Sequence, residues 1–306
     1  MMFKKILVPL DGSELSEWAL KPAVQLAEAA EGEIILLRSL IPVYMTVPTL
    51  ANEYAWMWPE YSREQMRVEV QEYLAAVRQK YHKPGVRWQS LDVEGDAAGE
   101  IVDTALAENV DLIVMSTHGW SGMQKWALGS VTERVLHNAT CPVLTTRSPQ
   151  PITRLAITLD GSQLAEQAVE PALAVAAGLN ARVMLLRVNE PLPANHGPAI
   201  EFEWTMGKDR AYGMVQERQA QSEAYLEEVT QRYARDDVIV QLMVVDGQPV
   251  DKILEIADLH SIDLIAMSTH GRTGLRRWLY GSVTAKIMRG FEGHMLIIRP
   301  PANDLN

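Results

Sequence analysis

The chain has 306 residues, which suits two domains of ordinary size, and it carries a net charge of −11 with a pI near 5.2. That charge argues against a nucleic-acid binder with a broad basic face, and no apolar run is long enough to span a bilayer. The single cysteine, Cys141, excludes an internal disulfide and a cysteine-rich zinc site, so we expect a cytoplasmic protein that binds neither nucleic acid nor a membrane.

Strand-like and helix-like segments alternate through the first half. In chain order the pattern predicts a strand at 6–8, an amphipathic helix within 13–30, a strand at 34–37, a helix over 62–81, a strand near 86–93, a helix through 101–106, a strand at 112–115, a helix over 130–137 and a strand at 143–146. Two helices have a predicted inner face, consisting of Met66, Val70, Tyr73, Leu74, Val77 and Tyr81 in one and Ile101, Val102, Ala105 and Leu106 in the other. Such alternation predicts an α/β fold with a parallel sheet and helices on both faces.

The second half repeats the first. Residues 111–135 and 263–287 are identical at 14 of 25 positions, and Leu-Asp-Gly-Ser occurs in both halves. Equivalent residues are 149 apart near the N-terminus and 152 apart later, which places a net three-residue insertion between the second strand and second helix of the second copy. We therefore predict two tandem doubly wound domains, 1–148 and 152–306, each with a five-stranded parallel sheet, joined by a short proline-containing linker at 149–151.

The ends of the predicted strands indicate where a ligand would bind. In doubly wound folds, ligands bind at the carboxyl ends of strands where the crossover direction changes. Asp11 follows the first strand and segment 116–130 follows the fourth, so we expect the two to converge on one site. The second copy would repeat that site with Asp160 and segment 268–282.

Both segments have the chemistry of an anion-binding turn. Each reads Ser-Thr-His-Gly, then nine residues, then a Gly-Ser that opens a helix. A helix start presents unpaired amides and a positive dipole end, so a phosphate group held by backbone donors is predicted. The alternative is that Ser130 and Ser282 are only N-caps and the glycines only turn formers.

These motifs resemble those of the universal stress proteins, over essentially the whole chain. The resemblance includes Asp-Gly-Ser after strand one, Gly95 and Gly247 after strand three, and Cys-Pro-Val-Leu at 141–144. It implies an adenine nucleotide alpha-hydrolase-like fold and ATP as the ligand, with Mg²⁺ as a candidate companion of the phosphates. Nucleotide-binding members carry Gly-x-x-Gly-(nine residues)-Gly-Ser/Thr, and the first glycine is here Ser116 or Ser268. Serine weakens binding if that position needs a backbone conformation restricted to glycine, but we expect that it needs only a small residue.

The resemblance also implies which residues hold the nucleotide. They are Asp11, Ser39, Gly119, Gly122, Gly129, Ser130 and Val131 in the first domain, and Asp160, Val188, Gly271, Gly274, Gly281, Ser282 and Val283 in the second. Ser39 and Val188, beside the adenine, are the weaker matches. Arg272, Arg276 and Arg277 surround the second loop, which favours a tighter second site for a triphosphate unless they are solvated surface charges.

The predicted function is that of an ATP-binding regulator or sensor in a stress response, which binds nucleotide rather than turning it over. The sequence has no P-loop lysine motif and no metal-ligand spacing, and neither His118 nor His270 has an evident triad partner. We therefore assign no catalytic or metal-ligating residue and expect a slow ATPase at most. A nucleotide-free stress protein that binds a partner or sequesters a ligand is the main alternative, and a slow nucleotide hydrolase is a remote one.

Family members commonly pair through the fifth strand. The resemblance thus implies an intramolecular pseudo-dimer in which 143–146 meets 295–298 along an antiparallel edge. A homodimer of the whole chain and an unknown protein partner are further expectations.

Overall fold

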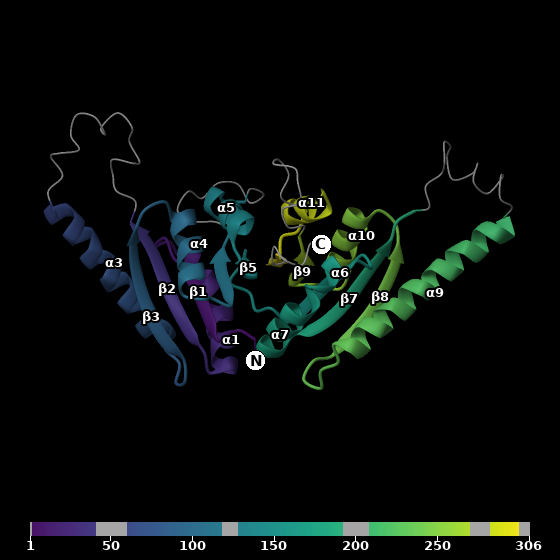
Figure 1. The fold of residues 1–306 in the computed structure, drawn as a ribbon, viewed down its shortest axis with the longest axis horizontal. Coiled ribbons are helices and arrows are strands. Elements are labelled where there is room, and N and C mark those ends of the chain that lie inside the picture. Colours follow the sequence, from purple (N-terminus) through teal and green to yellow (C-terminus); the bar gives the residue numbers. More distant parts are fainter. Residues whose placement is uncertain (1, 41–59, 118–127, 192–207, 270–281, 300–306) are drawn as a thin grey trace, which may run out of the picture.

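The computed structural model describes residues 2–40, 60–117, 128–191, 208–269 and 282–299 (Figure 1). The first half contains β1 (Lys5–Pro9), the 3-10 helix η1 (Ser16–Ala19), α1 (Leu20–Ala30), β2 (Glu33–Leu40), α3 (Glu60–Tyr81), β3 (Arg87–Glu94), α4 (Ala97–Ala107), β4 (Leu112–Ser116), α5 (Ser130–Asn138) and β5 (Val143–Thr146). The second half contains β6 (Arg154–Leu159), α6 (Gln163–Glu166), α7 (Val169–Leu179), β7 (Arg182–Asn189), α9 (Lys208–Arg232), β8 (Val240–Asp246), α10 (Pro249–Leu259), β9 (Leu264–Ser268), α11 (Ser282–Gly290) and β10 (His294–Ile298). The alternation predicted from the sequence is confirmed in both halves.

All ten of these strands form one sheet, in the order β3-β2-β1-β4-β5-β10-β9-β6-β7-β8. Pairing is parallel within each half. Between the halves, β5 and β10 pair antiparallel, with Leu144 opposite Leu296. The two predicted five-stranded units are therefore present, and they are joined into one sheet through the fifth strand of each. This confirms the predicted intramolecular pseudo-dimer. The domain boundaries at 148 and 152 stay a prediction.

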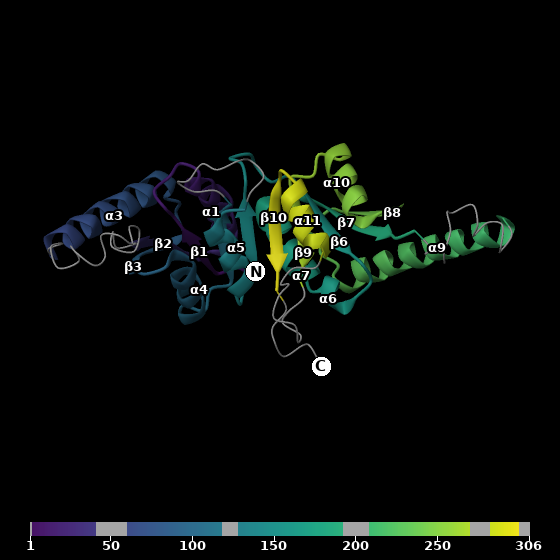
Figure 2. The same ribbon diagram turned by 90° about the horizontal axis from the view of Figure 1, so that it is seen from above.

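The molecule is elongated, with α3 and α9 at its far ends and β5 and β10 near the middle (Figures 1 and 2). One face of the sheet packs against α1, α3, α7 and α9, and the other against α4, α5, α10 and α11. Each apolar layer runs through both halves, so the halves share their core as well as their sheet. In the described part of the chain, no helix combines the length and apolarity needed to cross a bilayer.

Two sequence-based expectations need correction. The helix expected within 13–30 is split into η1 and α1, because Pro22 has no N–H to donate to a carbonyl one turn earlier and so must lie in a first turn. Leu106 was expected to face inward with Ile101 and Ala105, but it is 62% exposed. Ile101 and Ala105 are four residues apart and share the buried stripe of α4, whereas Leu106 lies about 100° further round the helix.

Candidate functional site

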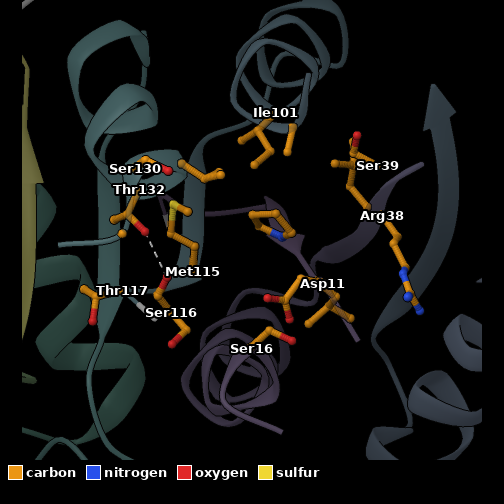
Figure 3. Close-up of a pocket in the computed structure, with 16 residues that line it drawn as sticks. Asp11, Ser16, Arg38, Ser39, Ile101, Met115, Ser116, Thr117, Ser130 and Thr132 are labelled. Atoms are coloured by element: carbon orange, nitrogen blue, oxygen red, sulfur yellow. Dashed lines mark hydrogen bonds between the residues drawn. The ribbon is translucent and has the colours of Figure 1, made fainter. Parts of the chain in front are cut away.

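A cavity of about 470 Å³ lies at the carboxyl ends of β1, β2 and β4 (Figure 3). The strand order reverses between β1 and β4, so this is the switch point at which doubly wound folds bind ligands. Its described lining includes five of the seven residues predicted for the first domain, namely Asp11, Ser39, Gly129, Ser130 and Val131. The other two, Gly119 and Gly122, lie outside the described residues.

The Asp11 carboxylate is fixed by its own turn. Its Oδ1 accepts hydrogen bonds from Ser13 N at 2.9 Å and Ser13 Oγ at 2.6 Å. Gly12 between them has a φ of +89°, a left-handed conformation that favours glycine. The Asp11 side chain faces the cavity in Figure 3, with Ser116 and Ser130 on the opposite wall.

An arginine and a tyrosine support this turn from outside. The Arg38 guanidinium lies 4.9 Å from the centroid of the Tyr73 ring and packs on Gly12, where a Cβ would come within 2.9 Å of Arg38 Nη2. Burial raises the pKa of Tyr73 to about 12, so the ring is a neutral partner for the cation. Sequence reasoning missed this pair, although the repeat carries it again as Arg187 and Tyr225.

Gly129 closes the opposite wall. Its N–H donates to the Thr117 carbonyl at 3.0 Å, and a Cβ on Gly129 would lie 2.8 Å from that oxygen. Its φ of −61° is open to any residue, so glycine is needed here for close approach and not for a special backbone conformation. Thr132 Oγ1 joins the same two segments by donating to the Ser116 carbonyl at 3.1 Å.

The start of α5 is available to an anion. Gly129 occupies the N-cap position without a side-chain cap, and Ser130 is the first helical residue. The alternative that Ser130 is the N-cap is therefore wrong. The first helical bond runs from Glu133 N to Gly129 O, so the amides of residues 130–132 have no partner within the helix. The positive end of the helix dipole adds to their attraction for a phosphate.

The serine at the position of the first glycine fits without strain. Ser116 ends β4 and Ser268 ends β9, and neither is among the described non-glycine residues with positive φ. Ser116 is buried and lines the first cavity. The position therefore needs a small side chain at a strand end rather than a conformation restricted to glycine.

The second half repeats the site on a smaller scale. A cavity of about 210 Å³ is lined by Asp160, Val188, Ser282 and Val283 from the predicted set, together with Ser268. Among the described residues the buried Ser268 hydroxyl has no hydrogen-bond partner. Gly271, Gly274 and Gly281 lie outside the described residues, as do Arg272, Arg276 and Arg277, on which the expectation of a tighter second site depends.

The strand-two positions differ between the two cavities. Ser39 Oγ donates to the Gly95 carbonyl at 2.8 Å, tying β2 to the turn after β3. Val188, its counterpart, has an apolar side chain that cannot form this bond. The first cavity therefore presents a polar group where the second presents a methyl surface.

The described residues contain no group of three or more His, Cys, Asp or Glu side chains that could hold a metal ion. Asp11 and Asp160 each stand as the single carboxylate in the described lining of their cavity. A divalent cation at either site would therefore take most of its ligands from a bound phosphate and water.

The fold and the two cavities define a tandem doubly wound α/β protein with an aspartate opposite a helix start in each half. The family model for the Universal stress protein family matches residues 2–147 and 151–299, and the chain belongs to that family. It is 26% identical to the universal stress protein E homolog of Haemophilus influenzae, over 99% of this chain and all of the relative.

Relatives of half this length also match. The chain is 36% identical to universal stress protein MJ0531 of Methanocaldococcus jannaschii, over 49% of this chain and 85% of the relative. The crystal structure of a universal stress protein from Archaeoglobus fulgidus resembles it with a TM-score of 0.68 at 20% identity, covering 98% and 99% of the two chains. That structural similarity concerns the fold alone.

Proposed function

We propose that this chain is a cytoplasmic stress-response regulator or sensor that binds ATP in the first-domain cavity and repeats the site in the second domain. One observation carries the proposal: the switch-point cavity brings Asp11, Ser39 and the uncapped start of α5 together. Its volume of about 470 Å³ is of the size that small-molecule ligands occupy, about 300–1,000 Å³. Each domain, 1–148 and 152–306, is proposed to form its site from its own residues.

The residues divide by chemistry. Asp11 would accept hydrogen bonds from the ribose hydroxyls, and Ser39 would lie beside the adenine ring. The amides of residues 130–132 would hold the phosphates, with the Ser116 hydroxyl as a further polar group. Bound Mg²⁺ would supply charge neutralisation of the phosphates.

Binding rather than turnover suits this lining. The described lining includes no lysine or histidine, its cation Arg38 lies over the Tyr73 ring, and Asp11 already accepts two bonds from Ser13. Phosphoryl transfer also depends on an oriented nucleophile, for which the described lining offers no base other than this engaged aspartate. The protein is therefore proposed as a sensor whose nucleotide state is read by a partner.

The test begins with the purified protein. Denaturation followed by chromatography identifies any nucleotide that it carries, and titration of the stripped protein with ATP measures its affinity. Recovered ATP or saturable binding supports the proposal. If the protein carries no nucleotide and shows no saturable ATP binding, the proposal is overturned in favour of a nucleotide-free binding module. Rapid release of ADP or AMP would favour the hydrolase.

Single variants assign the sites. Gly129→Leu should abolish binding in the first domain, because even a Cβ would lie 2.8 Å from the Thr117 carbonyl. Gly281→Leu is the matching change in the second domain. Gly213→Leu is the control, since a Cβ at Gly213 meets no heavy atom within 4 Å.

A further inference from the structure

Two arginines cross between the halves at the seam of β5 and β10. Arg147 follows β5, and its guanidinium donates to Phe291 O at 2.6 Å and to Met288 O at 2.5 Å, at the end of α11. Arg299 follows β10 and donates to the His137 carbonyl in the last turn of α5. The two arginines are 152 positions apart, so they are one repeated feature of the sequence.

Both contacts suit the chemistry of a helix end. The last carbonyls of a helix have no partner within it, and the dipole favours a cation there. Arg147 is partly buried, and burial lowers its pKa, so its guanidinium needs these carbonyls to offset lost hydration. The two arginines therefore hold the ends of α11 and α5 by specific hydrogen bonds.

The two helices held in this way each begin at one of the cavities. Ser130, the first residue of α5, lines the first cavity, and Ser282, the first residue of α11, lines the second. Each helix has nine residues, a length of about 13 Å, and so moves as a short rigid rod. One end of each rod lies in its own domain's cavity, and the other is held by an arginine of the opposite domain.

We propose that Arg147 and Arg299 are positioning residues that act across the seam, Arg147 by holding α11 for the second cavity and Arg299 by holding α5 for the first. This inference rests on the proposed function. Each arginine thereby sets where the first residues of a helix of the other domain lie in that domain's cavity.

The test measures ATP affinity at one site at a time. In a Gly129→Leu background only the second site remains, and in a Gly281→Leu background only the first. Arg147→Gln should weaken the second site about tenfold and leave the first within about twofold, and Arg299→Gln should do the reverse. Arg147→Lys and Arg299→Lys keep the positive charge but lose the planar guanidinium with its several N–H donors. Each should weaken the site of the opposite domain as well, but by less than the glutamine variant.

A matched control is present in the second domain. Arg235 pairs with the Asp237 carboxylate beyond the end of α9, its Nε donating to Asp237 Oδ1 at 2.8 Å, and neither residue is in the described lining of either cavity. Arg235→Gln removes a bound arginine away from both cavities and should leave both affinities unchanged. The proposal is overturned if an arginine variant weakens both sites equally, if it weakens the site of its own domain instead of the opposite one, or if it weakens neither site.

Hydrogen exchange separates this inference from the proposed function. If the wild-type protein binds no ATP, the proposed function fails, and the positioning claim is still decided by amide protection. Arg147→Gln should then speed exchange in α11 and not in α5, with the opposite result for Arg299→Gln. Equal exchange in both helices would overturn the positioning claim on its own.

Discussion

Acid should weaken the seam between the two halves through His294, which lies in β10. His294 is 3% exposed, and its Nδ1 accepts a hydrogen bond from Arg147 N at 3.4 Å, which requires that nitrogen to be unprotonated. Burial lowers the pKa of His294 to about 4, with Arg147 acting in the same direction and Asp263 opposing it. The imidazole is therefore neutral in the folded protein at pH 7.

The sign and size of the effect follow from linkage. The pKa in the unfolded chain is about 6.5, so between that pH and about 4 the unfolded state binds a proton that the folded state does not. The stability is fully present above about pH 6.5 and is lost as the pH falls. A difference of about 2.5 units at 1.36 kcal/mol each gives a loss of about 3 kcal/mol by pH 4. His137, whose pKa is also lowered chiefly by burial, adds to the loss.

Urea unfolding at a series of pH values from about 7.5 to 4 measures this loss. His294→Asn keeps an acceptor for Arg147 N but does not titrate, so its free energy of unfolding should fall by about 3 kcal/mol less than that of the wild type over this range. His82→Gln, which removes an exposed imidazole, is the control and should behave as the wild type. Parallel loss of stability in the wild type and His294→Asn would refute the assignment.

Three further outcomes are expected. Burial raises the pKa of Cys141 to about 11, so its thiol should resist iodoacetamide at pH 8 in the native protein and react fully in denaturant, as followed by mass spectrometry. Gly12→Ala should cost more stability than Gly85→Ala in thermal unfolding, because both positions have positive φ, but only at Gly12 would the Cβ meet a side chain, within 2.9 Å. Asp263→Ala should destabilise by about 1–3 kcal/mol in urea, since its Oδ2 accepts from the amides of 153–154 at 2.8 and 2.9 Å, and an unchanged midpoint would contradict this.

Local signals in the sequence were enough for much of the fold and for the place of each candidate site in it. Runs of apolar residues and the repeat predicted the strands and their parallel arrangement, because each depends on short patterns or on equivalence between halves. The antiparallel seam was implied by the resemblance to the universal stress proteins. Asp11 and Gly129–Ser130 were predicted to converge because strand carboxyl ends meet at one edge of a sheet.

What the sequence did not indicate depends on contacts between distant segments. Arg38 and Tyr73 are 35 positions apart, and neither lies in a motif, so nothing local marks them as a pair that supports the Asp11 turn. Arg147 reaches a helix end more than 140 positions away in the other half. The repeat offered the signal that was overlooked, since an arginine retained at the same place in both copies has equivalent surroundings in each.

The joining of both copies in one chain has a consequence for how the two halves can diverge. Separate chains that pair through an antiparallel edge form a symmetric dimer of identical sites, and dilution separates them. Here β5 and β10 belong to one molecule, so their local concentration is fixed by the linker and does not depend on expression level. Each half meets only the other, which frees them to specialise: Ser39 faces the larger cavity and Val188 the smaller one. The covalent link thus keeps two unequal copies of one domain paired within a single chain, so the two cavities no longer have to bind the same ligand.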